Sequence, residues 1–228
     1  MHDAAIGDAP TGDAPSATPI GDAPSVTPVL VQEATHGASS GSPLTVTLPS
    51  LPTAGDVLIV LAGAAQAPLS GVSGGGVAEW TPAARSPINC NEEIWYGTSD
   101  GTSAAVSILL PGNMNVIFGH VSQWHGLATT PLDAATASSA AASPVTPGTL
   151  MTRQASDLLV LAASEPLPVT WGEPAPGSWT ALKMVTAAPC AQAAWYRFVT
   201  GAGNYAPTVT ESGTGKWDAA TAAFAVAP

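Results

Sequence analysis

The sequence predicts an all-β protein: an internally duplicated antiparallel β-sandwich of jelly-roll-like type, preceded by an extended proline-rich N-terminal arm. Two observations indicate this fold class. The chain consists of short segments rich in Val, Thr, Ile and aromatic residues, separated by Gly and Pro clusters, and helical periodicity is nearly absent. In addition, the landmarks of its first half recur in the second half about 100 residues later. We therefore expect strands in two halves, at residues 30–130 and 151–228.

The repeat keeps its register over several landmarks. The segment AGDVLIVLA at 54–62 corresponds to ASDLLVLAA at 155–163. The other matching pairs are Trp80 and Trp179, Cys90 and Cys190, Trp95-Tyr96 and Trp195-Tyr196, and Trp124 and Phe224. We expect the two halves to share one core, with two small tandem sandwiches as the alternative.

Individual strands follow from local patterns. LTVTL at 44–48 alternates apolar and polar residues, as in a strand with one buried face. AGDVLIVLA is continuously apolar after its turn, which is typical of a strand buried on both faces. Further strands are expected at 104–110, 116–124, 207–211 and 217–227.

Four regions result from this division of the chain. They are an arm at 1–29, a first half at 30–130, a connection at 131–150 and a second half at 151–228. The connection includes an Ala- and Ser-rich stretch at 134–142 that prolines bracket and that has no apolar stripe.

The arm contains the tandem repeat GDAPSATPI and GDAPSVTPV at 12–29, with a further GDAP at 7–10. Each proline fixes φ and moves its predecessor out of the helical region, so the segment is expected to be extended. Its composition is also that of a disordered tail. We favour an arm that docks on a partner. Its contact residues are expected to be Gly7, Asp8, Pro10, Gly12, Asp13, Pro15, Pro19, Gly21, Asp22, Pro24 and Pro28.

Charge argues against two classes of partner. Charged residues make up only 9% of the chain, the net charge is −11, and the five Lys and Arg residues are scattered. Binding to nucleic acid needs clustered basic residues, and an anionic membrane repels an acidic chain. The longest apolar run is about half of a membrane span. The first residues lack the basic and apolar regions of a secretory signal, so we expect assembly in the cytoplasm.

The order of these motifs resembles a family of phage virion-associated β-sandwich domains from capsid-surface, minor tail and tail-fibre proteins. The resemblance rests on GDVLIV at 55–60, WT at 80–81, WY at 95–96, QWHGL at 123–127, TPLDAA at 130–135 and SDLLVLAAS at 156–164. It covers roughly residues 43–228. It implies a virion protein that binds other virion subunits or a host surface, and it implies no catalytic residues.

Motifs with a chemical meaning have simpler structural explanations. GVSGG at 71–75 matches a nucleophile elbow, but no helix follows Ser73, so a flexible loop is expected. His120 and His125 lie five residues apart on one strand and should face opposite sides. Asp56 and Asp157 begin matching strands and are expected to cap turns. Glu92 and Glu93 should face opposite sides of a strand, which does not make a catalytic carboxylate pair. No metal site and no cofactor are expected.

The cysteines and tryptophans remain. Cys90 and Cys190 occupy equivalent positions, and we favour reduced, buried thiols, with a disulfide between the halves as the alternative. Trp80, Trp95, Trp179 and Trp195 are equivalent in pairs, which favours core positions. Trp171 and Trp217 have no aromatic counterpart and are predicted to form a contact or sugar-stacking surface.

The sequence thus predicts a non-enzymatic virion structural protein. The favoured form is a phage capsid decoration or head-surface protein whose arm docks on neighbouring capsid subunits, the major capsid protein in particular. It would be a homo-oligomer within a large assembly, made in the host cytoplasm and displayed on the virion surface. The alternative is a tail or tail-fibre β-sandwich that binds a host surface glycan. An enzyme such as a glycan hydrolase is the third possibility.

Overall fold

The predicted all-β class is confirmed. The computed structural model describes residues 26–38, 41–65, 67–86, 89–111, 117–187, 189–213 and 215–228, and these form sixteen strands and no helix. Each pairing between these strands is antiparallel. Among the described residues no helix has the length and hydrophobicity needed to cross a membrane.

The strands form two large and two small sheets. The first large sheet has the order β1 (Val29–Ala38), β8 (Ile117–His125), β3 (Val57–Ala64), β6 (Glu93–Thr98), β5 (Thr81–Arg85). The second has the order β12 (Thr180–Ala181), β14 (Cys190–Val199), β11 (Asp157–Pro166), β16 (Trp217–Val226), β9 (Leu127–Ala140), and β13 (Val185–Ala187) also pairs with β14. The small sheets are β2 (Leu44–Thr47), β7 (Ala105–Leu109), β4 (Gly71–Gly74), and β10 (Leu150–Thr152) with β15 (Gly203–Tyr205).

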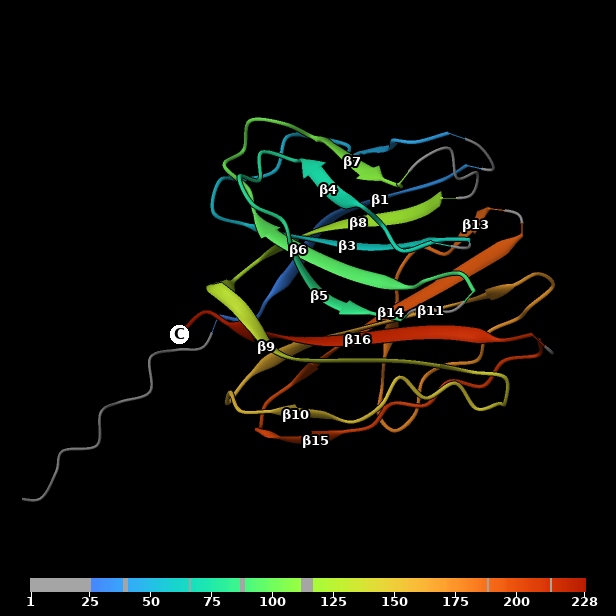
Figure 1. The fold of residues 1–228 in the computed structure, drawn as a ribbon. Coiled ribbons are helices and arrows are strands. Elements are labelled where there is room, and N and C mark those ends of the chain that lie inside the picture. The colour runs from blue at the N-terminus through green and yellow to red at the C-terminus, as the bar shows by residue number, and fades with distance from the viewer. Residues whose placement is uncertain are drawn as a thin grey trace, which may run out of the picture.

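The four sheets stack as layers (Figure 1). The two large sheets lie against each other in the middle, the β2–β7–β4 sheet covers the outer face of the first, and β10 and β15 lie outside the second. An inner apolar cluster therefore contains residues of both halves, including Ile59 and Trp124 from the first and Val160 and Phe224 from the second.

Burial on both faces explains the continuously apolar strands. In β3, Val57, Ile59 and Leu61 face the inner cluster, whereas Leu58 and Val60 face the cluster under β2 and β7. Every residue of β3 is buried, which confirms the prediction for this segment. The prediction for LTVTL is also confirmed, because β2 alternates buried and exposed residues. The expected strands at 104–110, 116–124 and 217–227 appear as β7, β8 and β16.

The two large sheets have the same internal order. In the first, β3 pairs with β6 and β8, and in the second, β11 pairs with β14 and β16. Ring contacts across the interface are reciprocal: Tyr96 meets Phe224 edge-on at 5.5 Å, and Tyr196 meets Trp124 edge-on at 5.0 Å between centroids. Each half thus places its tyrosine against the aromatic ring near the end of the other half.

Two segments differ from expectation. Residues 127–140, mostly expected as connection, form the 14-residue strand β9. Its small Ala, Ser and Thr side chains lie along the Ala-rich β16, and β9 is a sheet edge, where Pro131 removes no ladder hydrogen bond. Residues 207–211, expected as a strand, make only isolated bridges, which join Thr208 to Ala175, Val209 to Val145 and Glu211 to Trp171.

Candidate functional site

The predicted arm contacts are outside the described residues, except for Pro28. The first residue that the structure describes is Val26, just before the edge strand β1. Val26, Val29 and Val31 are 43%, 53% and 47% exposed, and Leu51 is exposed as well. Three exposed valines therefore lie within six residues of each other, where the arm enters the body.

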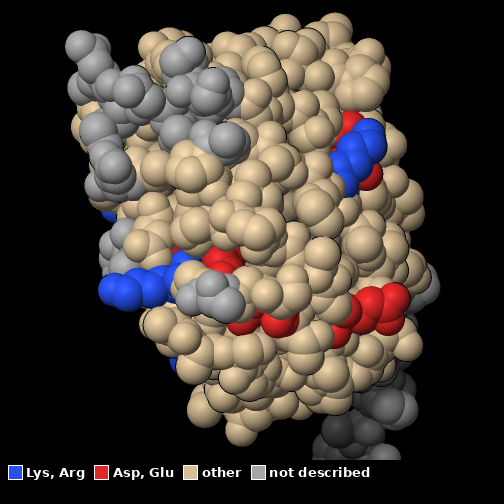
Figure 2. All heavy atoms as spheres, turned by 90° about the vertical axis from the view of Figure 1, so that its right-hand side faces the viewer, with Lys and Arg blue, Asp and Glu red and all other residues tan. Residues whose placement is uncertain are grey.

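The protein has few charged side chains, since Asp, Glu, Lys and Arg make up only 9% of its residues. Figure 2 shows one face, on which Lys and Arg or Asp and Glu occupy a few separate spots among uncharged residues. This face has no extended basic area of the kind that binds phosphates.

The two tryptophans predicted to form a contact surface lie in different environments. Trp217 is 2% exposed, packs in an apolar cluster that includes Val145 and Trp195, and donates its indole N–H to the Ala142 carbonyl at 2.8 Å. The prediction of a surface role for Trp217 is therefore wrong, because the surrounding alanines of β16 leave room for a large inward-facing ring. Trp171 is only partly buried and lines a surface groove.

This groove has a volume of about 320 Å³ and is lined by two short segments, 170–172 and 210–212. The segments run antiparallel, with Gly172 N–H donating to the Thr210 carbonyl at 2.8 Å and Ser212 N–H to the Thr170 carbonyl at 3.0 Å. Trp171 and Glu211 are direct bridge partners. Because side chains alternate along a strand, Trp171 and Glu211 share one face of this pair, whereas Thr170, Thr210 and Ser212 share the other, exposed face.

A second carboxyl group lies beside Glu211. Glu165, at the end of β11, is buried and accepts a hydrogen bond from Gly215 N–H at 2.8 Å. Burial raises the pKa of Glu165, and the hydrogen bond from Gly215 N–H partly offsets this shift. The charge of the Glu211 carboxylate and a hydrogen bond between the two carboxyl groups raise the pKa further. The two carboxyl groups are buried against each other, close to the shielded indole Nε1 of Trp171.

A buried polar cluster joins the two halves near one end of the large sheets. Glu92 accepts a hydrogen bond from Gln192 Nε2 at 2.5 Å, and both residues are buried, with exposed fractions of 0% and 1%. Burial raises the pKa of Glu92 well above its ordinary value of 4.5, although the hydrogen bond from Gln192 opposes this shift. The side chains of Glu92 and Gln192 therefore link the sheets and are closed to any substrate in this structure.

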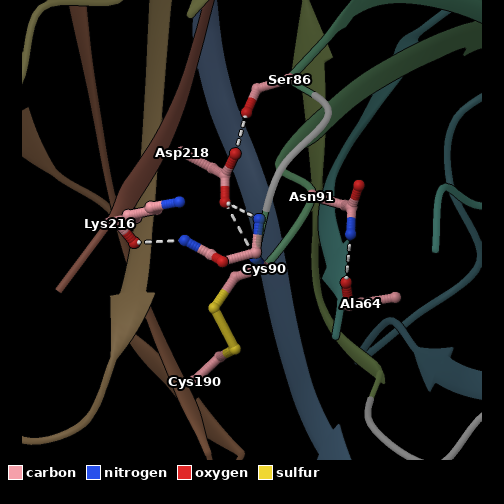
Figure 3. Close-up of a disulfide and its surroundings, with 8 residues drawn as sticks. Ala64, Ser86, Cys90, Asn91, Cys190, Lys216 and Asp218 are labelled. Atoms are coloured by element: carbon pink, nitrogen blue, oxygen red, sulfur yellow. Dashed lines mark hydrogen bonds between the residues drawn. A yellow bond between two sulfur atoms is a disulfide. The ribbon is translucent and has the colours of Figure 1, made fainter. Parts of the chain in front are cut away.

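Asp218 of β16 holds the loop that precedes β6 (Figure 3). Its carboxylate accepts hydrogen bonds from the Ser86 hydroxyl at 2.5 Å and from the backbone N–H groups of Asn89 and Cys90 at 2.8 Å each. Asn89 in turn donates to the Lys216 carbonyl at 3.1 Å. A carboxylate from the second half thus fixes a loop of the first.

A disulfide joins Cys90 to Cys190 beside this carboxylate (Figure 3). The favoured expectation of reduced thiols is therefore wrong, and the alternative pairing is what the structure contains. The two Cα atoms are 6.2 Å apart, a separation at which cysteines can be bridged. The pairing arises because the two large sheets bring the loop before β6 and the first residue of β14 together.

The histidines face opposite sides of β8, as predicted, and each pairs with a carboxylate. His120 is buried and its Nε2 lies 2.7 Å from Glu33 Oε2 on β1. His125 is largely exposed and its Nδ1 lies 2.8 Å from Asp56 Oδ1. The side chain of Asp56 therefore holds His125, and Gln123 as well, where a turn cap was expected.

Asp157 also departs from a capping role. It is buried at the start of β11, near the Thr152 hydroxyl and the Asp133 carboxylate. Burial raises its pKa to about 6, with a further contribution from the Asp133 carboxylate that the Thr152 hydroxyl partly offsets. The group lies in a small cavity lined by Val26, Thr27 and Pro28, where the arm enters the body.

The remaining motifs are structural in the described residues. Ser73 lies in strand β4, opposite Ser107 of β7, so the flexible loop expected there is wrong. The strand forms because β7 offers an open edge, and Gly74, Gly75 and Gly76 then turn the chain with positive φ angles. Glu92 and Glu93 face different surroundings, since Glu93 binds Arg85 at 3.0 Å and the Trp95 indole N–H at 2.8 Å. In the part of the chain that the structure describes, no group of three or more His, Cys, Asp or Glu residues is placed to hold a metal ion.

Comparison with known proteins found no protein-family model, no curated protein and no solved structure that matches this chain.

Proposed function

We propose that this chain is a non-enzymatic structural protein of a phage virion, a decoration protein of the capsid surface whose N-terminal arm docks on neighbouring capsid subunits. The observation that carries the proposal is the junction of arm and body. A tandem proline repeat leads directly into the edge strand β1, and three exposed valines, Val26, Val29 and Val31, mark the junction. Extended chain with apolar side chains and no core of its own gains stability by lying on another surface.

The body supports this role as a compact platform. Its layers share an inner apolar cluster, and a disulfide and the Asp218 carboxylate tie the halves together. Disulfides persist on virion surfaces, which are oxidising once the particle leaves the host, while the chain itself is made in the cytoplasm. The sparse charge of its surface suits a subunit that packs against copies of itself and other virion proteins.

We further propose that the body is an internally duplicated, jelly-roll-like sandwich. Three features support a duplication: the shared strand order of the large sheets, the contact between the equivalent cysteines, and the reciprocal ring contacts of Tyr96 and Tyr196. In a duplicated pair related by a pseudo-twofold axis, only residues near the axis meet their own equivalents. Cys90 and Cys190 are such a pair.

The docking proposal is tested by a phage whose genome lacks the codons for residues 2–25 of this chain. The matched control replaces the same residues with a Gly/Ser linker of equal length. We expect both variants to fold with the melting temperature of the full chain and to be missing from purified particles, as measured by quantitative mass spectrometry. Full occupancy of particles by either variant would contradict arm docking.

A further inference from the structure

One inward-facing position of the large sheets carries an aromatic ring in the second half and a small side chain in the first. Phe198 pairs with Leu158 of β11, and Thr98 pairs with Val57 of β3, so Phe198 and Thr98 hold corresponding positions in the two sheets. An open cleft with a volume of about 320 Å³ lies beside Thr98, and the proposed structural role does not use it. We propose that this cleft binds a neutral, phenol-like aromatic ring at the place that corresponds to the Phe198 side chain.

In the second half, Phe198 completes a group of three rings. Its centroid lies 5.6 Å from that of Tyr196 and 6.2 Å from that of Trp124, with interplanar angles of 64° and 79°. Aromatic side chains prefer such edge-on contacts at these distances. The cavity that Phe198 lines has a volume of only about 60 Å³, so little space is left beside this ring.

In the first half, the corresponding place has two rings and a cleft. Tyr96 meets Phe224 edge-on, as the corresponding pair of rings does in the other half, but the third position is the exposed Thr98. The volume of the cleft lies at the lower end of the range of small-ligand sites, roughly 300–1,000 Å³. A single aromatic ring is a ligand that suits a cleft of this size.

The side chains that line the cleft offer both an aromatic contact and hydroxyl groups. One wall consists of Thr81 on β5 and of Tyr96 and Thr98 on β6, and the other consists of residues 129–131 near the start of β9. Thr81 is directly opposite Tyr96, and such pairs share a face of the sheet. Alternation along β6 places Thr98 on that face too, and Tyr96 packs there against the inner apolar cluster. A bound ring can therefore pack edge-on against Tyr96 while its hydroxyl group exchanges hydrogen bonds with a threonine.

The charge of the cleft favours a neutral ligand. Among the described residues that line it, only Glu79 is charged, and Glu79 is exposed. An anionic ligand would be repelled by this carboxylate, and screening by solvent limits the effect to roughly two- to fivefold in affinity. A neutral phenol binds without this repulsion.

A titration of the full chain with p-cresol, followed by the backbone amide NMR shifts of Tyr96, Gly97 and Thr98, tests the proposal. We expect a Kd of roughly 1–20 mM, because a single ring buries little apolar area. Thr98→Phe supplies the ring from the chain itself and should weaken p-cresol binding about tenfold or more. Thr98→Val keeps the size of the side chain and should retain binding. Thr200→Phe adds a ring at an exposed position of the other half and is the matched control.

Two further probes define the ligand. p-Hydroxybenzoate has the same ring with a negative charge and should bind roughly two- to fivefold more weakly than p-cresol, a difference that Glu79→Gln should remove. N-acetyltyrosinamide presents the ring on a peptide backbone. If it binds at least as tightly as p-cresol, the site belongs to a tyrosine side chain of another protein, and if it binds more weakly, the site belongs to free small phenols.

Two outcomes would overturn the inference. They are amide shifts that do not respond to p-cresol up to about 50 mM, and equal binding of p-cresol by the wild type and by folded Thr98→Phe. If Thr98→Phe fails to fold, Thr98→Leu, which fills part of the cleft, decides by the same comparison. Deleting residues 2–25 should leave p-cresol binding unchanged, so the failure of this site and the failure of arm docking are distinguishable.

Discussion

Glu92 and Gln192 are one hundred residues apart in the chain and meet in a buried hydrogen bond between the two large sheets. Each follows its cysteine, Cys90 or Cys190, by two residues, so two neighbouring pairs of equivalent positions meet at the same place. One member is an acid and the other an amide. A carboxylate at both positions would place two buried like charges in contact, which is costly.

Replacing Glu92 with glutamine should change how stability depends on pH. The pKa of Glu92 is raised in the folded chain, so its protonated form is favoured there. Its contribution to stability is complete below the unfolded pKa, near 4.5, and is lost progressively as pH rises towards the folded value. We expect Glu92→Gln to gain stability relative to the wild type between pH 4 and pH 8 in urea denaturation. Glu79→Gln, at an exposed position, is the control, and identical pH profiles for Glu92→Gln and the wild type would refute the assignment.

Asp157 offers an independent pH test with a narrower window. Its pKa is raised to about 6 from an ordinary value of 3.8, so stability is lost as pH rises from about 4 to about 6. We expect Asp157→Asn to gain on the order of 2–3 kcal/mol relative to the wild type across that range. In Asp133→Asn the loss of stability should occur at lower pH than in the wild type, because the Asp133 carboxylate contributes to the raised pKa of Asp157. A variant whose stability parallels the wild type from pH 4 to pH 7 would show that Asp157 is solvated.

Removing the disulfide should destabilise the fold without unfolding it. The bond closes a loop with a sequence separation of 100 residues and thereby restricts the unfolded chain. We expect the double variant Cys90→Ala with Cys190→Ala to lose about 2–5 kcal/mol of unfolding free energy. Dithiothreitol should bring the wild type towards the same value and leave the variant unchanged. Two free thiols in the untreated wild-type protein would contradict the bond itself.

The two halves should unfold together. Trp95 and Trp195 are buried in the outer cores of the first and second half, on either side of the shared inner cluster. Trp95→Ala and Trp195→Ala should each cost about 3–5 kcal/mol. The measurement is calorimetry with the disulfide reduced, so that only packing couples the halves. Each substitution should lower the temperature of a single unfolding transition. Two transitions, each moved by only one substitution, would instead establish two independent sandwiches.

The strongest sequence signals predicted the central strands but not the edges. The strands β3 and β11 were predicted because each is a short, continuously apolar run after a turn residue, a pattern typical of a strand buried on both faces. Strand β9 was missed because its Ala, Ser and Thr residues carry no apolar pattern, and only its pairing with β16 defines it. Residues 207–211 alternate like a strand, yet their partners at Val145, Trp171 and Ala175 come from separate segments and give only bridges.

The candidate sites depend on contacts between distant segments, which limits prediction from sequence. The equivalence of Cys90 and Cys190 did indicate that they could meet, but the expected reducing compartment favoured the wrong chemical state. Trp217 lacks an aromatic counterpart, and its burial follows from the small residues around it. Trp171 was identified, but its partner Glu211 was not, because forty residues separate them in the chain.

Cryo-electron microscopy of the native particle tests the central claim most directly. The account predicts density for the sandwich body on the outer capsid surface, with continuous density for residues 2–25 running from β1 across neighbouring capsid subunits. A body located at the tail, or a body on the capsid whose residues 2–25 contact no other subunit, would contradict it.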